Sequence, residues 1–391
     1  MAVQTVTVVG GALAGLRCAE ALRRYGFTGP ITVFAGEGPD AHDRPPLSKG
    51  YLMGEVAESV VRLGPNLAHE LDWRAGVRAR SFRLSNRQLS TDDGEQRDVD
   101  GLVIATGLRP RQLPSLAAEL GGVHMLRGLA DAAALRNDLG AAPSVAVIGS
   151  GFIGTEIAST CRTLGLDVTV IALEPPLSRV LGPHAEAYGR RMQQEGVQMR
   201  IGAGVSGAMW TDAPSGPRVT ALNLDSGERI ASDVVVVAVG GTPEVGWLAG
   251  SGIAVEDGVL CDPAGLVEGA ERVVAAGDVA RCYRPLLGAP ARIEHWTNAA
   301  DQAVAAAAGL LGMPGPPPTT PSFWTDQFGA RIQGVGMPAH ADTHTLVDGD
   351  IESGRFTIEA YRADRLIGAV VAGGPRALLG YRQELMATVT A

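Results

Sequence analysis

The residues with the clearest chemistry are glycines in two turns that share one layout. The segments "VTVVGGALAGLRCAEALRRYG" (6–26) and "VAVIGSGFIGTEIASTCRTLG" (145–165) each contain a β-branched run, a glycine-rich turn and a helical apolar pattern. A second strand follows each segment, in "ITVFAGE" (31–37) and "VTVIALE" (168–174). Two such βαβ units in one chain indicate a pair of dinucleotide-binding Rossmann units. The alternative is a structural duplication without ligands.

The glycines of these turns have separable roles. Gly10 allows the tight bend and Gly15 allows the helix to pack closely on the strand, while Ala12 stands where the backbone approaches a pyrophosphate. The second turn has glycine at all three positions: Gly149, Gly151 and Gly154. Both turns direct backbone N–H groups and the positive end of a helix dipole toward a phosphate pair.

A carboxylate for an adenosine ribose is expected about 20 residues after such a turn. Glu37 and Glu174 occupy corresponding positions after the second strand of each unit. The alternative is that both are solvated loop acids. The basic residue nearest to Ala172 and Glu174 is Arg179, so no adjacent cation is available for a 2′-phosphate. This favours NADH over NADPH without excluding NADPH.

The stretch "DRPPLSKG" (43–50) places Lys49 shortly after two adjacent prolines, which stiffen the backbone. A cation held in this way is a candidate for a cofactor site. The alternative is a solvated lysine in a surface turn.

Further segments are predicted to complete the two βαβ units and to form a third domain. Strands that end in glycine are predicted in 99–110, 231–244 and 271–282, where Asp278 directly follows the glycine. A helix is predicted in 296–312 and a proline-rich linker in 313–321. Residues 322–391 are expected to form a small α+β domain, with strands in 355–361 and 366–372 before a final helix.

The composition narrows the class of protein. The chain has 391 residues, 46% of them hydrophobic and 19% charged, which suits two or three soluble domains. We expect a cytoplasmic protein without a signal peptide or membrane association, because no long apolar run is present and a strand pattern begins at once. A net charge of −9 disfavours nucleic acid as a partner. The four cysteines lack metal-ligand spacing, so no metal is expected.

Seven segments together resemble one family. In chain order they are "VVGGALAGLRCAEALRRYGFTGPITVF", "DRPPLSK", "LVIATGLRPR", "VIGSGFIGTEIAS", "AAGDVAR", "IEHWTNAADQA" and "FWTDQFGARIQGVG". They resemble the NADH-dependent ferredoxin reductases of bacterial cytochrome P450s and aromatic-ring dioxygenases, which are glutathione-reductase-like flavoproteins. The resemblance implies an α/β fold with two Rossmann-like domains and a C-terminal α+β domain. The FAD domain would comprise 1–109 and 240–315, the NAD domain 110–239, and the C-terminal domain 320–391.

The resemblance also implies site residues. Arg44 and Lys49 would lie on the diphosphate and isoalloxazine side, Asp278 would bond the ribityl chain, and the 295–298 backbone would face the flavin N1–C2 edge. The full FAD set is Gly10, Ala12, Leu13, Ala14, Gly15, Glu37, Arg44, Pro45, Lys49, Val77, Ala105, Thr106, Gly107, Arg109, Gly277, Asp278, Glu294, His295, Trp296 and Ala299. The NAD set is Gly149, Gly151, Phe152, Ile153, Gly154, Glu156, Glu174, Arg179, Val239 and Gly240. Two positions depart from the family pattern, Ala12 and Ala172, the second in place of an acid.

The family's disulfide-reducing cousins carry redox cysteines after the first βαβ unit, whereas this chain has no cysteine between Cys18 and Cys161. Electrons would therefore pass from NADH to the flavin and then singly to an iron–sulfur ferredoxin, with Lys49 and Glu156 as the catalytic pair. The cluster could be 2Fe-2S, 3Fe-4S or 4Fe-4S. The alternatives are an NADH oxidase or quinone reductase, and a redox-responsive binding protein similar to apoptosis-inducing factor.

Docking of an acidic ferredoxin on an acidic chain requires a local basic surface. The resemblance places four arginines near the flavin edge: Arg281, Arg284, Arg292 and Arg331. Trp296 and Trp324 are expected on the electron-exit side, with core packing as the alternative.

Overall fold

The computed structural model describes residues 3–38, 41–63, 70–117, 120–214, 216–317 and 319–390. The first βαβ unit forms the centre of a five-stranded sheet in which every pairing is parallel. Its order is β21 (Val273–Ala275), β9 (Gly101–Ile104), β1 (Val6–Val9), β2 (Ile31–Ala35) and β5 (Asp72–Ala75). Strands β1 and β2 are buried along their whole length, as expected for uniformly apolar strands covered on both faces.

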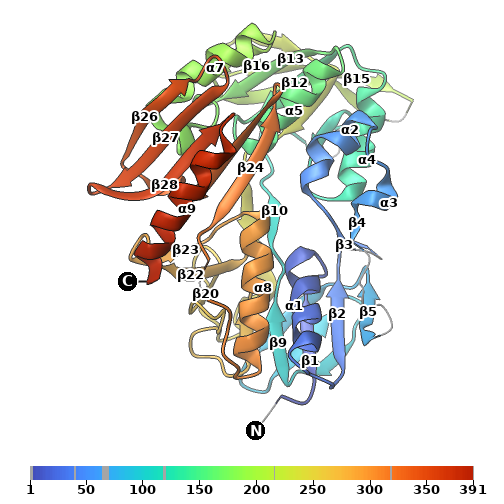
Figure 1. The fold of residues 1–391 in the computed structure, drawn as a ribbon. Coiled ribbons are helices and arrows are strands. Elements are labelled where there is room, and N and C mark those ends of the chain that lie inside the picture. The colour runs from blue at the N-terminus through green and yellow to red at the C-terminus, as the bar shows by residue number, and fades with distance from the viewer. Residues whose placement is uncertain are drawn as a thin grey trace.

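Two helices pack beside each other over this sheet, α1 (Leu13–Arg24) and α8 (Trp296–Leu310) (Figure 1). Alanines on α8 allow the close approach, since Ala303, Ala306 and Ala307 are fully buried. Smaller elements complete this part of the chain: β3 (Ala41–His42) with β4 (Arg62–Leu63), β6 (Ala79–Arg83) with β7 (Gln88–Thr91) and β8 (Gln96–Asp98), and β20 (Val259–Cys261) with β22 (Ala280–Arg284) and β23 (Ala289–Ala291).

The second βαβ unit forms the centre of another five-stranded parallel sheet. Its order is β11 (Val123–Met125), β18 (Val234–Val237), β12 (Ser144–Ile148), β13 (Asp167–Ala172) and β14 (Gln198–Ile201). Its helices are α4 (Leu129–Leu139), α5 (Phe152–Thr163), α6 (Ser178–Leu181) and α7 (Ala185–Gln194), and an antiparallel sheet of β15 (Val205–Ala213), β16 (Gly216–Leu224) and β17 (Arg229–Ala231) adjoins it.

The C-terminal body is an antiparallel sheet covered by one helix. Its order is β24 (Ser322–Gln327), β25 (Ala330–Gly336), β28 (Arg365–Ala372), β27 (Arg355–Arg362) and β26 (Thr343–Asp350), with α9 (Pro375–Thr390) packed on β25 and β28. The α/β fold with two dinucleotide-binding sheets and a small α+β body confirms the predicted fold class. No helix among the described residues is long and apolar enough to cross a membrane.

The chain crosses between the two parallel sheets along a short ribbon. Here β10 (Leu108–Pro110) pairs antiparallel with β19 (Gly241–Pro243). The segments 99–110 and 231–244, predicted as single strands, are each two strands, because Gly107 and Gly240 turn the backbone at positive φ. The domain limits drawn from the sequence fall at this ribbon and stay predictions.

Residues 41–63, called the excursion below, follow β2 and extend from the first sheet to the second (Figure 1). It contains the 3₁₀ turn η1 (Pro45–Ser48) and the short helices α2 (Gly50–Met53) and α3 (Glu58–Val61). In Figure 1 α2 lies beside α4, and η1 contacts α5. The "DRPPLSKG" stretch (43–50) follows the first sheet's strand β2 and packs against helices of the second sheet.

Candidate functional site

Lys49 and Glu156 are 107 positions apart along the chain. They form an ion pair where η1 contacts α5. Lys49 Nζ lies 2.8 Å from Glu156 Oε1, and only 17% and 7% of the two side chains are exposed. Lys49 follows η1 and also donates to the Pro45 carbonyl at 3.1 Å, so the proline pair fixes one of its hydrogen-bond acceptors. Glu156 is on α5, close to the second glycine turn.

A buried hydrogen-bond chain extends from this ion pair. Ser48 Oγ donates to Glu156 Oε2 and Thr325 Oγ1 donates to Glu156 Oε1, both at 2.5 Å. Gln327 Nε2 donates to Thr325 Oγ1, and the Tyr188 hydroxyl donates to Gln327 Oε1, both at 2.9 Å. The carboxylate is therefore satisfied by donors from the excursion and from the C-terminal sheet. A buried charge requires such partners.

The sequence contained two signals of this site that were missed. Thr325 and Gln327 occupy buried positions of β24, where a half-buried strand normally places apolar side chains. Lys49 is the only lysine of the chain, so arginine supplies the remaining 32 of the 33 basic residues. A side-chain ammonium is thus present only at this largely buried pair, where a guanidinium would differ in shape and donor geometry.

The first glycine turn is held by backbone contacts. A Cβ on Gly10 would lie 2.2 Å from the Ala105 carbonyl oxygen, and one on Gly15 would lie 1.9 Å from that of Gly10. Ala12 is the N-cap of α1, with Leu13 and Ala14 in its first turn. Gly10 and Gly15 are therefore required by packing, as the sequence pattern suggested.

The second turn separates packing from ligand access. A Cβ on Gly149 would lie 2.3 Å from the Ala238 carbonyl oxygen, and one on Gly154 would lie 2.1 Å from that of Gly149. Gly151, in contrast, faces open space, with no atom within 4 Å of an added Cβ. Phe152 and Ile153 begin α5 next to it, and Ile153 is 44% exposed. This open N-terminal end of a helix fits a diphosphate.

Four charged side chains of the predicted FAD side form a connected set. Both carboxylate oxygens of Glu37 accept hydrogen bonds from Arg44 at 2.8 Å, and Arg44 also donates to the Arg127 carbonyl at 2.7 Å. Arg127 donates to Asp278 at 3.2 Å. Burial alone would raise the pKa of Glu37, but Arg44 and other nearby cations hold this pKa below its usual value.

Sequence reasoning missed Arg127, which lies in the turn before α4. Its guanidinium is buried beside a second arginine, and desolvation together with Arg44 lowers its pKa. Its Nε is buried with no hydrogen-bond partner among the described residues. Arg44 is paired with Glu37 and Arg127 with Asp278, so the unpartnered Arg127 Nε is the donor that fits an anionic ligand such as a diphosphate. No sequence motif indicates a role for Arg127, because this residue reaches the site only through the tertiary fold.

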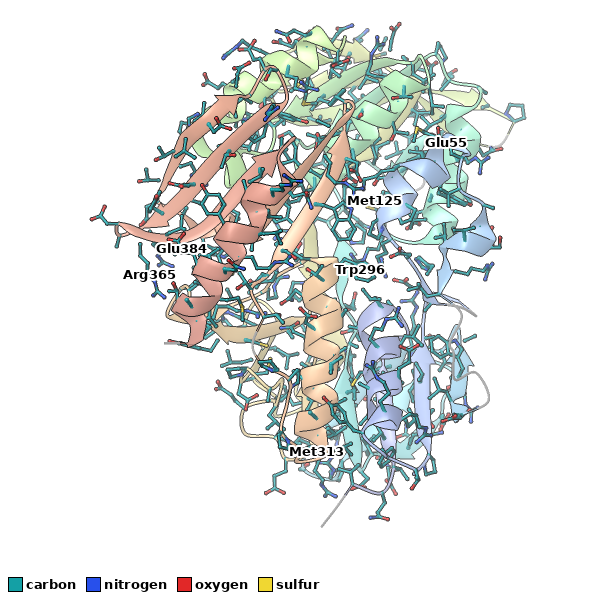
Figure 2. All side chains as sticks on the ribbon, viewed as in Figure 1. Glu55, Met125, Trp296, Met313, Arg365 and Glu384 are labelled. Carbon is teal, nitrogen blue, oxygen red and sulfur yellow. The ribbon has the colours of Figure 1, made fainter. Side chains whose placement is uncertain are left out.

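The end of α8 faces the other two bodies, and Figure 2 shows Trp296 at this end. His295 is the N-cap residue, and its ring lies 5.0 Å from that of Phe323. Desolvation, assisted by Arg284 and His340, lowers the pKa of His295 to about 4. The Trp296 indole donates to Asp43 at 2.7 Å and packs edge-on against Trp324 at 6.2 Å. The two tryptophans therefore contact each other next to the excursion that carries Lys49.

The remaining predicted residues surround these features. Thr106 donates to the Glu244 carbonyl at 2.7 Å, Arg109 is largely exposed, and Glu294 pairs with Arg292. The other positions of the first unit are Val77, Gly107, Gly277 and Ala299, of which Ala299 is buried in α8. In the second unit Glu174 is exposed and accepts a hydrogen bond from Ser178, while Arg179, Val239 and Gly240 lie in surrounding turns and α6.

The predicted basic surface is not formed by the four arginines proposed for it. Three of them are neutralised in ion pairs: Arg281 with Glu256, Arg292 with Asp257 and Glu294, and Arg331 with Asp326. Arg284 is partly buried, and its pKa is lowered by desolvation. Sequence spacing could not reveal these carboxylates, because two of the pairs join distant segments.

Comparisons with known proteins agree with this geometry. The family model described as "Pyridine nucleotide-disulphide oxidoreductase" matches residues 4–303, and that described as "Reductase C-terminal" matches residues 322–390. Rhodocoxin reductase of Rhodococcus erythropolis is 34% identical over 97% of this chain and 89% of its own. The biphenyl dioxygenase system ferredoxin–NAD(+) reductase component of Paraburkholderia xenovorans is 34% identical over 95% and 90%. The solved covalent putidaredoxin reductase–putidaredoxin complex superposes with a TM-score of 0.93 at 28% identity, covering 99% and 94%.

The chain belongs to the pyridine nucleotide-disulphide oxidoreductase family, which binds FAD and NAD(P)H. Within it, the relatives are ferredoxin and rubredoxin reductases of oxygenase and cytochrome P450 systems. The protein is thus an NAD(P)H-dependent oxidoreductase of the ferredoxin reductase type, which confirms the resemblance noted in the sequence. Rubredoxin, which the sequence reasoning did not consider, joins the classes of partner that the family serves.

Proposed function

We propose that this chain passes electrons from NADH, through bound FAD, to a small iron–sulfur ferredoxin that serves a cytochrome P450 or a ring-hydroxylating oxygenase. The observation that carries the proposal is the buried Lys49–Glu156 pair, held where the two dinucleotide units meet. The absence of any cysteine between Cys18 and Cys161 supports a route without a thiol relay.

The chain's own residues would divide the work in the following way. FAD, when bound, accepts a hydride at N5 and releases electrons singly. Gly10, Gly15 and Arg127 would hold its diphosphate, with the dipole of α1 directed at the same charge. The Lys49 ammonium would present a fixed positive charge, and Glu156 would orient it from the NAD side. Because Glu156 is on the helix that follows Gly151, its position depends on the turn where nicotinamide dinucleotide would bind.

Preference for NADH rests on the strand that follows this turn. β13 ends at Ala172, and the next residues are the exposed Leu173 and Glu174. A carboxylate at this edge would accept hydrogen bonds from the ribose hydroxyls and would repel a 2′-phosphate. The proposal therefore predicts faster turnover with NADH than with NADPH.

The test uses the purified flavoprotein in three variants, Lys49→Met, Lys49→Arg and Glu156→Gln. We expect each to retain FAD, measured from its visible absorbance, and to be reduced by NADH at least about tenfold more slowly in stopped flow. Lys49→Arg is expected to rescue little, because a guanidinium cannot replace a compact ammonium in a buried pair. Arg190→Met is the matched control, since it removes an exposed ion pair with Glu352.

Unchanged rates of flavin reduction in all three variants would reject the assigned role of the pair. The partner is tested separately by NADH-driven reduction of a panel of ferredoxins and a rubredoxin, with oxygen and quinones as competing acceptors. Preferential turnover with a ferredoxin supports the proposal, and preferential turnover with oxygen or a quinone refutes it.

A further inference from the structure

Two cysteines outside the proposed catalytic site face each other on neighbouring strands. Cys261 ends β20 and Cys282 lies in β22, and the two are register partners in a parallel pairing. Register partners project their side chains to the same face of a sheet, and the two sulfurs are 2.9 Å apart. Both are free thiols, buried in the hydrophobic cluster that includes strands of the first parallel sheet. Backbone spacing between paired strands lies within the range that a disulfide spans.

The surroundings make the two thiols unequal. Gln302 Nε2 donates to Cys282 Sγ at 3.2 Å, and the buried guanidinium of Arg284 lies nearby with its Nη2 unpartnered among the described residues. The hydrogen bond shared with Cys261, together with Arg284 and Gln302, lowers the pKa of Cys282 despite burial and the charge of Asp262. The same hydrogen bond and burial raise the pKa of Cys261. An activated thiol beside a protonated one is the arrangement of a redox-active pair.

The pair is also connected to the loop before Asp278. Gln302 Oε1 accepts hydrogen bonds from the Gly277 N–H at 3.0 Å and from Asn298 at 3.2 Å. Gln302 thus binds Cys282 with one end of its amide and the Gly277 backbone with the other. One hydrogen-bonded side chain therefore separates Cys282 from this loop.

We propose that Cys261 and Cys282 are a peroxide-reactive dithiol that closes reversibly to an intrachain disulfide. The Cys282 thiolate attacks one oxygen of hydrogen peroxide, the O–O bond breaks, and a sulfenic acid forms as water leaves with one proton. The Cys261 sulfur then attacks the Cys282 sulfur, the S–S bond forms, and the hydroxyl leaves as a second water with the Cys261 proton. Two thiols are oxidised, and one peroxide is reduced to two waters. The inference rests on the thiol geometry and not on the proposed function.

The burial of the pair sets its selectivity. Both sulfurs are buried, which disfavours a bulky thiol reagent and leaves a small peroxide as the proposed oxidant. Cys18 and Cys161 provide internal controls, because each is a buried free cysteine whose pKa is raised to about 12 by burial.

The experiment treats the reduced flavoprotein with hydrogen peroxide, alkylates the remaining thiols after denaturation, and maps the peptides by mass spectrometry. We expect a Cys261–Cys282 cross-link that dithiothreitol reverses, with Cys18 and Cys161 alkylated throughout. Recovery of alkylated Cys261 and Cys282 after peroxide treatment, or a cross-link that involves Cys18 or Cys161, would overturn the proposal.

Single substitutions separate the two steps. Cys261→Ser should leave a sulfenic acid on Cys282 that dimedone traps, whereas Cys282→Ser should abolish the reaction with peroxide. Arg284→Met should slow cross-linking by about tenfold, since it removes the cation that favours the thiolate. In wild type, closure should also raise the midpoint of thermal unfolding by several degrees. Peroxide that consumes Cys282 equally fast with and without Arg284 would contradict the activated-thiol argument.

Discussion

Glu156 receives its hydrogen bonds from Ser48 and Thr325, and its ion pair from Lys49. The carboxylate has no freedom to rotate away while these donors remain in place. A buried ion pair contributes little net stability, but loss of one partner is costly because the other charge is left uncompensated. Substitution of a residue that contacts Glu156 should therefore impair the protein, although none of these residues belongs to a glycine turn.

Thr325→Val tests this sensitivity at a single hydroxyl. The variant removes a donor to Glu156 and the acceptor of Gln327, so the free energy of unfolding should fall by about 1–3 kcal/mol. Thr325→Ser retains the hydroxyl and should recover most of this loss. Urea unfolding of both variants provides the measurement, and equal stability of Thr325→Val and wild type would contradict the role of the hydroxyl.

His295 should make stability dependent on pH. Its folded-state pKa of about 4 lies below the value of about 6.5 in an unfolded chain, so the unfolded state binds more protons between these values. The contribution of His295 to stability is therefore complete above pH 6.5 and decreases as the pH falls toward 4, by on the order of 3 kcal/mol. His295→Phe preserves an aromatic contact with Phe323 and should flatten this slope in urea unfolding at a series of pH values. A slope identical to that of wild type would rule out His295 as its source.

At the scale of the element, the two glycine turns share one layout, but their glycines differ in whether an added Cβ would fit. A Cβ added to Gly154 would overlap the Gly149 carbonyl, whereas a Cβ added to Gly151 would meet open space. The first turn already has a methyl group at the position of Gly151, in Ala12. Packing thus fixes two glycines of the second turn, and only the proposed ligand requires the third.

A matched pair of alanine substitutions separates the two requirements. Gly154→Ala should destabilise the fold by about 1–3 kcal/mol, because the Cβ clashes with backbone. Gly151→Ala should leave the melting temperature unchanged and weaken NADH binding several-fold. Thermal unfolding and NADH titration of both proteins provide the comparison. A destabilised Gly151→Ala, or one that binds NADH normally, would show that the open space is not a ligand cradle.

The elements were largely predictable, and the site was only partly so. Strands β1, β2, β12 and β13 and the helices α1 and α5 follow from short-range periodicity, which a sequence displays directly. Lys49 and Glu156 were identified by resemblance. Arg127 and Tyr188 could not be identified from the sequence, because their partners come from distant segments. The failed basic surface has the same cause: ion pairs such as that of Arg281 with Glu256 depend on tertiary packing.

At the scale of the whole molecule, three bodies are joined by buried polar contacts near Glu156. Thr160 donates to the Ser48 carbonyl, and the Phe328 N–H donates to Ser159, both at 2.7 Å. With the bond between Tyr188 and Gln327, these contacts connect the C-terminal sheet and the excursion to the second parallel sheet. We therefore expect these contacts to couple the stability of the C-terminal sheet to that of the second parallel sheet.

Ser159→Ala tests this coupling. It leaves the Phe328 N–H without its acceptor and should lower stability by about 1–2 kcal/mol. Amide hydrogen exchange should accelerate first in β24 and β25, while protection of the first parallel sheet stays unchanged. Ser206→Ala is the control, because Ser206 donates to Asn223 on the exposed surface. Uniform acceleration across the chain would contradict a local joint at Ser159.

The sole lysine of the chain has a consequence for measurement. Reductive methylation with isotopically labelled formaldehyde modifies amines, so its only side-chain target in this protein is Lys49. The ammonium would yield one methyl resonance from a buried reporter beside Glu156, separate from that of the terminal amine. Chemical shift, titration and exchange at that single signal would follow dinucleotide arrival in solution, without assignment of the remaining spectrum.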